Sequence, residues 1–147
     1  MDQDIIADKI NLTELANKLF MYTDSKEWDK LMDEVFKETI WFDASSNGGG
    51  PACQMKAQEI CDMWKQGLSD LDAVHHQAGH YIITVKNAAA DIYGYAVATH
   101  YKKAAIKGAV RTFVGSYDLK AERGKDGWRL SQFKYNLKYA DGNLTLE

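Results

Sequence analysis

The feature that most constrains the fold is a change of hydrophobic period near Ala73. Before this point apolar residues recur every three to four positions, as on amphipathic helices. After it apolar and polar residues alternate, as in half-buried strands. The last connection in this half contains Asp126-Gly127, a strong hairpin signal. We therefore expect an antiparallel meander of four long strands, at about 74–86, 91–103, 109–122 and 128–139.

The first half carries the signals of three helices. Asn11 followed by Glu14 has the spacing of a capping box, so the first helix should begin near Leu12. Thr23-Asp24-Ser25 then interrupts the helical pattern with residues that prefer caps and turns, which places Asp24 at a corner. Ser25 can cap a second helix. The expected apolar face of that helix is Trp28, Leu31, Met32, Val35 and Phe36, and a third helix is expected from about Met55 to Leu68.

Helices followed by a long meander indicate an α+β fold, with the helices packed on one face of a bent sheet. A chain of 147 residues without repeats or a linker is expected to form a single domain, 1–147. Apolar residues make up 46% of the sequence, which excludes a disordered segment. The 18 basic residues form no cluster and are outnumbered by 21 acidic ones, so no nucleic-acid partner is expected.

The chain shows no targeting or membrane signal. Its first residues, Met1-Asp2-Gln3-Asp4, are acidic, and no apolar stretch approaches the ~20 residues that span a bilayer. We therefore expect a cytoplasmic protein without a membrane partner. Cys53 and Cys61 match no metal or redox spacing and are expected to be reduced thiols.

One strand carries a stripe of small residues that predicts a cavity. Alternation places Ile92, Gly94, Ala96, Ala98 and His100 on one face. Small residues beneath helices leave volume unfilled, unless Trp28 or Trp64 fills it, and both alternatives stay open. The opposite face carries Tyr93, Tyr95, Val97, Thr99 and Tyr101, which suits either a subunit interface or an ordinary exposed sheet surface.

The histidines lie on two of the expected strands. Alternation places His76 and His80 on one face, although Gly79 could seat a bulge that changes the phase after it. By themselves His76 and Asp24 are ordinary structural residues. If the fold brings them together, the carboxylate would fix the tautomer of the imidazole and make it a general base. A rival interpretation is a metal site formed by His76, His100 and Asp24; His76 and His80, ~13 Å apart along a strand, cannot share one ion.

Three segments together resemble a known family. They are the corner Tyr22–Leu31, the strand start His76-x-x-x-His80, and Gly115-Ser116-Tyr117 followed by the hairpin Asp126–Leu130. They resemble the SnoaL-like, scytalone dehydratase-like branch of the nuclear transport factor two-like superfamily, from about Asn11 to Tyr139. The resemblance implies a cone-shaped half-barrel, a strongly bent mixed or antiparallel sheet wrapped around three helices. It also implies a deep pocket, a homodimer or homotrimer, and neither metal nor organic cofactor.

The same resemblance implies roles for individual residues. Asp24 would orient the base and His76 would be that base. The two tyrosines with which scytalone dehydratase polarises the substrate carbonyl are not kept, since Thr23 occupies one position and Asp43 or Phe42 lies near the other. The expected substrate contacts are Tyr22, Asp43, Ala98, His100 and Tyr117.

The function expected from this resemblance is a cofactor-independent lyase or isomerase. It would catalyse dehydratase-type β-elimination or proton transfer on a small cyclic or aromatic hydroxy-carbonyl compound, so a small hydrophobic or aromatic ligand is the expected partner. The alternatives are a non-catalytic small-molecule-binding or assembly domain, or the small subunit of a ring-hydroxylating oxygenase.

Overall fold

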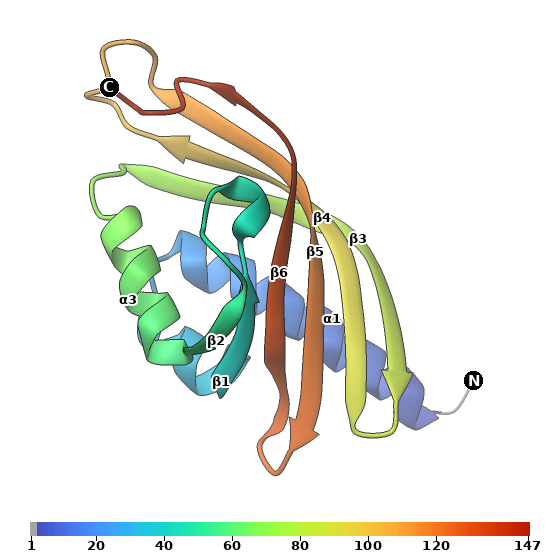
Figure 1. Cartoon of the computed structure of the whole chain (residues 1–147). Coiled ribbons are helices and arrows are strands. Elements are labelled where there is room, and N and C mark those ends of the chain that lie inside the picture. The colour runs from blue at the N-terminus through green and yellow to red at the C-terminus, as the bar shows by residue number, and fades with distance from the viewer. Residues whose placement is uncertain (1–2) are drawn as a thin grey trace.

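The computed structural model describes residues 3–147. The chain begins with a long helix, passes through short helical turns, two strands and a second regular helix, and ends in four long strands (Figure 1). The elements are α1 (Gln3–Asp24), α2 (Trp28–Lys30), the π-helical turn η1 (Leu31–Val35), β1 (Phe36–Asp43), the 3-10 turn η2 (Ser45–Asn47), β2 (Cys53–Lys56), α3 (Ala57–Gly67), β3 (Ala73–Lys86), β4 (Ala89–Tyr101), β5 (Val110–Gly124) and β6 (Gly127–Gly142).

Within residues 3–147 the six strands form one curved, unclosed sheet in the order β2-β1-β6-β5-β4-β3. β1 runs parallel to β6, and every other neighbouring pair is antiparallel, so the sheet is mixed. The helix α1 lies along the concave face and α3 flanks β1 and β2 (Figure 1). The predicted α+β fold, with helices against a bent sheet, is confirmed. None of the helices within the described part of the chain is long and apolar enough to cross a membrane.

The meander follows the predicted strands to within three residues at each end. Along β4 the side chains from Ala90 to Ala98 alternate between buried and exposed, as the sequence pattern predicts. Gly127, with a φ of +95°, closes the β5–β6 hairpin, where Gly124 pairs with Gly127. Asp-Gly therefore marks this turn correctly, because glycine takes positive φ at little cost.

The first helix begins earlier than predicted. α1 is already helical at Gln3, and Asn11 is an exposed residue within it, so the expected capping box does not operate. The early turns are anchored by Asp8, a buried carboxylate. Asp8 accepts hydrogen bonds from Arg123 Nη1 at 2.9 Å and Trp128 Nε1 at 3.0 Å. These partners lie over a hundred residues away, so local sequence cannot reveal them.

The second helix is shorter than predicted and Ser25 does not cap it. α2 has only three residues, its N-cap position is Glu27, and the chain then continues through η1 into β1. Phe36, expected on a helix face, instead opens β1 and pairs with Leu130 of β6. The apolar spacing was real, since Leu31 and Val35 are fully buried, but pairing with β6 ends the helix.

A bulge in β3 reverses the orientation of the residues after Gly79. The register with β4 shifts between Gly79 and Ile82, and His80 has a φ of +56°. Tyr81 therefore faces the core, and His80 faces outward, where its ring stacks on Tyr95 with centroids 5.0 Å apart. The prediction that His80 shares a face with His76 is wrong, for the reason that Gly79 suggested.

Candidate active site

Asp24 and His76 meet at the corner between α1 and the start of β3. Asp24 Oδ1 lies 2.6 Å from His76 Nδ1, and Asp24 Oδ2 accepts the backbone N–H of His76 at 3.0 Å. The two side chains are 19% and 12% exposed. An ionised carboxylate only accepts hydrogen bonds, so Nδ1 carries the proton and Nε2 keeps a free lone pair. The pair is thus a positioned imidazole with one basic nitrogen available.

The corner after α1 is held close to β3 by its own contacts. Lys26 takes a positive φ of +56°, and Glu27 N–H donates to Tyr22 O at 2.8 Å, which turns the chain sharply after Asp24. Lys26 Nζ donates to Leu71 O at 3.2 Å, just before β3 begins. These contacts bring the end of the helix and the start of the strand together across some fifty residues of sequence.

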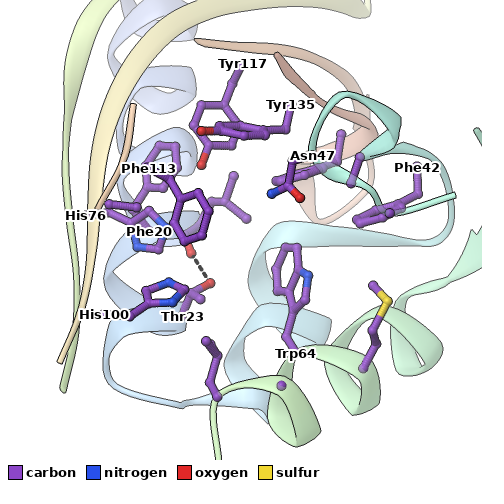
Figure 2. Close-up of a pocket in the computed structure, with 18 of the residues that line it drawn as sticks. Phe20, Thr23, Phe42, Asn47, Trp64, His76, His100, Phe113, Tyr117 and Tyr135 are labelled. Carbon is purple, nitrogen blue, oxygen red and sulfur yellow. Dashed lines mark hydrogen bonds between the residues drawn. The ribbon is translucent and has the colours of Figure 1, made fainter. Parts of the chain in front are cut away.

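His76 lines a cavity of about 420 Å³ between the helices and the concave face of the sheet (Figure 2). The walls are mainly aromatic, and Ala98 provides part of the small-residue floor. Trp64 forms a side of the cavity and does not fill it, so the prediction of a cavity is confirmed. The aromatic lining residues are Phe20, Phe42, Trp64, Phe113, Tyr117, Phe133 and Tyr135.

A second histidine faces the cavity in the opposite tautomer. His100 at the end of β4 is paired across the sheet with Arg111 of β5, and Arg111 Nε donates to His100 Nδ1 at 2.9 Å. A guanidinium can only donate, so His100 Nδ1 accepts and Nε2 carries the hydrogen. Burial, followed by the charge of Arg111, lowers the pKa of His100 to about 4. At neutral pH His100 is therefore a neutral hydrogen-bond donor.

This depressed pKa of His100 predicts a pH-dependent stability. Its folded value of about 4 lies below the ordinary 6.5, so between these values the unfolded chain binds more protons and stability falls on acidification. Since the ring is partly solvated, we expect a loss of about 2 kcal/mol between about pH 7.5 and about pH 4.5. Urea unfolding at both pH values should show this loss in the wild type and not in His100→Gln; equal pH dependence in both proteins would contradict it.

Tyr135 presents a buried hydroxyl without a partner. The residue is 6% exposed, and its Oη is a fully buried atom with no hydrogen-bond partner among the described residues. Gly115 leaves it room, because a Cβ there would lie 2.6 Å from this oxygen. The ring centres of Tyr117 and Tyr135 are 4.9 Å apart, and burial raises the pKa of both phenols. Buried hydroxyls are normally paired, so this one lacks a hydrogen bond, which a ligand oxygen would supply only if the surrounding side chains move to admit it.

The sequence profile of the SnoaL-like domain matches residues 4–134, most of the chain. The chain belongs to the SnoaL-like family. No protein with a curated description matches the sequence. Among solved structures, the Kfla4162 protein of Kribbella flavida is similar with a TM-score of 0.90 at 26% identity, over 97% of both chains.

Two further structural neighbours of this SnoaL-like chain carry the names of enzymes. A Novosphingobium aromaticivorans protein provisionally named scytalone dehydratase has a TM-score of 0.82 at 10% identity, over 96% of this chain and 91% of the other. A hexachlorocyclohexane dehydrochlorinase, LinA-type3 from Novosphingobium barchaimii, has a TM-score of 0.80 at 13% identity, over 96% and 93%. At these identities the likeness shows the fold alone.

The SnoaL-like fold gathers some of the predicted contact residues and leaves others outside. Ala98, His100 and Tyr117 line the cavity. Tyr22 lies outside the lining, because its hydroxyl donates to Glu34 Oε1 at 3.1 Å. Asp43 also lies outside it, because its Oδ1 accepts the N–H and O–H of Ser45 at 3.0 and 2.6 Å. Both side chains were expected to contact the substrate. Each is instead hydrogen-bonded to another residue of the protein.

Three polar residues that line the cavity were not predicted from the sequence as substrate contacts. Arg111 and Tyr135 line it, although sequence reasoning singled out neither. Strand alternation places Arg111 on a face with Phe113 and Tyr135 on a face with Phe133, but it does not show which end of that face lines the cavity. Thr23 lines the cavity too, but its hydroxyl donates to Leu19 O at 2.7 Å (dashed in Figure 2) and is already used.

The structure gives no support to a metal site formed by His76, His100 and Asp24. No group of three histidine, cysteine, aspartate or glutamate side chains in the described part of the chain is arranged to hold an ion. Both cysteines are free thiols; Cys53 is exposed and Cys61 is buried in α3. Burial raises the pKa of the Cys61 thiol to about 11, so it is a poor nucleophile.

Proposed function

We propose that this SnoaL-like protein is a cofactor-independent lyase or isomerase that removes a proton next to a carbonyl group. Its substrate is a small cyclic or aromatic hydroxy-carbonyl compound bound in the cavity. One observation carries the proposal: Asp24 holds His76 through Nδ1, so that the basic Nε2 is left for the cavity that the ring lines. A base oriented by a partly buried carboxylate is suited to proton abstraction.

In the proposed reaction His76 Nε2 takes the proton from the carbon next to the carbonyl. The electron pair of that C–H bond moves to the carbonyl oxygen and forms an enolate, while Asp24 stabilises the imidazolium. In an elimination, the enolate collapses, a carbon–carbon double bond forms, and the β-hydroxyl leaves as water with the proton that His76 carries. In an isomerisation, His76 returns the proton to another carbon of the same system.

The developing enolate oxygen needs donors, and the cavity offers two phenols. Tyr135 Oη has no hydrogen-bond partner among residues 3–147, and the ring of Tyr117 lies against the ring of Tyr135. A phenol with a raised pKa stays protonated and can donate to an oxyanion. In this proposal they take the place of the two carbonyl-polarising tyrosines of scytalone dehydratase, one of whose positions is occupied by Thr23 while Asp43 or Phe42 lies near the other. The aromatic walls exclude water and strengthen these hydrogen bonds.

The names of two neighbours fit the same class of reaction. One is provisionally named a dehydratase and another a dehydrochlorinase, and each name describes the removal of a small molecule from adjacent carbons. We extend only this class, elimination started by proton removal, to the present chain.

Two bicyclic ketones test the proposal directly. 1-Tetralone in D₂O should lose its C2 proton signal faster with the protein than without it, since exchange needs only proton removal. 3-Hydroxy-1-tetralone should lose water faster and give 1-naphthol, as measured by absorbance. The alternative, a non-catalytic binding domain or a small oxygenase subunit, predicts that neither rate rises above background even when the ketone binds.

We also propose that two or three copies of this chain associate through the outer face of β3 and β4. Tyr93, Tyr95, Val97 and Tyr101 are 40–49% exposed there, and no charged side chain lies among the outward residues from 93 to 101. An uncharged aromatic surface is typical of a subunit contact.

Replacing Tyr95 by arginine should break this association, because it places a charge in the centre of the face. Light scattering after size exclusion should give the mass of one chain, about 16.6 kDa, for Tyr95→Arg and a multiple of it for the wild type. Ile106→Arg, at a 94% exposed position between β4 and β5, is the control and should keep the wild-type mass. A wild type that already has the mass of one chain contradicts the proposal.

A further inference from the structure

The charge inside the cavity is one-sided. Arg111 is the only permanently charged side chain among the described lining residues, and no aspartate or glutamate is among them. Both carboxylate oxygens of Asp24 are already hydrogen-bonded to His76. The ligand therefore meets a positive group and no exposed negative one.

Arg111 has no carboxylate partner within the described chain. Its Nε donates to His100, and its Nη1 donates to Leu144 O at 3.0 Å. Asp70 is close enough for its charge to raise the pKa of Arg111, but Asp70 Oδ2 already accepts a hydrogen bond from Lys102 Nζ at 3.0 Å. The side chain is partly buried, and this burial lowers the pKa of Arg111. An anionic ligand in the cavity would therefore meet a partly buried cation for which no lining carboxylate competes.

The guanidinium is held in place and still has hydrogens to give. Its two protein hydrogen bonds use one hydrogen each from Nε and Nη1, which leaves one on Nη1 and both on Nη2 without a protein acceptor among residues 3–147. The Arg111 Cζ also lies 5.8 Å from the ring centre of Phe113, a second wall contact that fixes its position. A fixed planar fork with free hydrogens matches the two oxygens of a carboxylate.

We infer that the substrate is a cyclic or aromatic acid whose carboxylate binds Arg111 at the end of the cavity where β4 ends and β5 begins. His100, turned by Arg111 into an Nε2–H donor, lies at the same end and adds a second hydrogen bond to an acceptor oxygen there. This inference rests on the proposed function for the reaction and adds the charge of the substrate and its orientation.

The orientation follows from the positions of the polar groups. Figure 2 shows His100 on the opposite side of the pocket from Tyr117 and Tyr135, with His76 between them. A ring anchored by its carboxylate at Arg111 would extend along the aromatic walls and pass His76. Its carbonyl oxygen would then reach the two phenols, which places the carbon to be deprotonated at the base.

Binding of 2-naphthoate and its neutral isostere 2-naphthamide tests the inference without any turnover. Titration calorimetry at about pH 7.5 should give a dissociation constant at least about 10-fold lower for naphthoate in the wild type. Arg111→Gln should weaken naphthoate about 10- to 100-fold and leave naphthamide within about two-fold. The matched control is Lys120→Gln, which removes the same charge from an exposed position on the same strand and should change neither.

The outcomes separate this inference from the proposed function. Naphthoate that binds the wild type no better than naphthamide overturns the carboxylate site, even if exchange of the tetralone proton is catalysed. If naphthoate is preferred through Arg111 but no exchange is catalysed, the anion site stands and the reaction falls. Retained naphthamide binding shows that Arg111→Gln is folded. If that variant does not fold, the comparison of the two ligands in the wild type tests the inference. Arg111→Lys then gives the second test, since it keeps the charge and should keep a preference for naphthoate.

Discussion

His76→Ala should reduce proton exchange and elimination to the uncatalysed rate, a loss on the order of 10⁴-fold. The substitution removes the only basic nitrogen that Asp24 orients toward the cavity, and general-base catalysis is worth about 10²–10⁴ in rate. The rates are measured with 1-tetralone in D₂O and with 3-hydroxy-1-tetralone. Binding of 2-naphthamide should persist, since the walls that hold the ring remain.

The control for this variant lies on the same strand. His80→Ala removes an imidazole from the outer face of β3, where it stacks on Tyr95, and should leave both rates unchanged. Full activity in His76→Ala, or equal losses in the two variants, would reject His76 as the base.

Asp24→Asn should lower the same rates by about 10²–10⁴-fold while the fold is retained. The carboxylate accepts from both the backbone N–H and Nδ1 of His76, and an amide has only one oxygen. If that oxygen keeps the backbone N–H, the amide NH₂ faces Nδ1 and donates to it. The proton then moves to Nε2, so His76 has the wrong tautomer and loses its free lone pair.

The tautomer gives a signature that a merely structural role for Asp24 would not produce. Ring ¹⁵N chemical shifts should show an unprotonated Nε2 on His76 in the wild type and a protonated one in Asp24→Asn. Asp29→Asn, which removes the same charge from the neighbouring α2, should change neither the shifts nor the rates. Unaltered rates in Asp24→Asn would leave Asp24 as a residue that only ties the helix corner to β3.

Much of the fold could be read from the sequence because strand alternation is local. The period of two after Ala73 predicted the four long strands, and Asp126-Gly127 predicted the final hairpin. The helices were less predictable. Asp8 extends α1 through contacts with Arg123 and Trp128, and pairing with β6 draws Phe36 out of the second helix. Both effects come from residues about a hundred positions away. A single domain and a cytoplasmic location stay predictions.

The candidate active site could also be predicted only in part from the sequence. The sequence could nominate Asp24 and His76, because a corner residue and a strand histidine have recognisable local patterns. It could not exclude Tyr22 and Asp43, whose partners Glu34 and Ser45 depend on how the turns close. It also gave no reason to choose Arg111 or Tyr135 over other polar residues on the same strands, since exposure to the cavity depends on the curvature of the sheet.

The sequence by itself determined which face of β4 is apolar, where the final hairpin turns, and which short segments resemble the family, because each of these depends on residues close together in the chain. The tertiary structure alone decided which nitrogen of each histidine is free. A carboxylate at the end of α1 fixes one ring and a guanidinium across the sheet fixes the other, so the two imidazoles become an acceptor and a donor through contacts that sequence spacing does not encode.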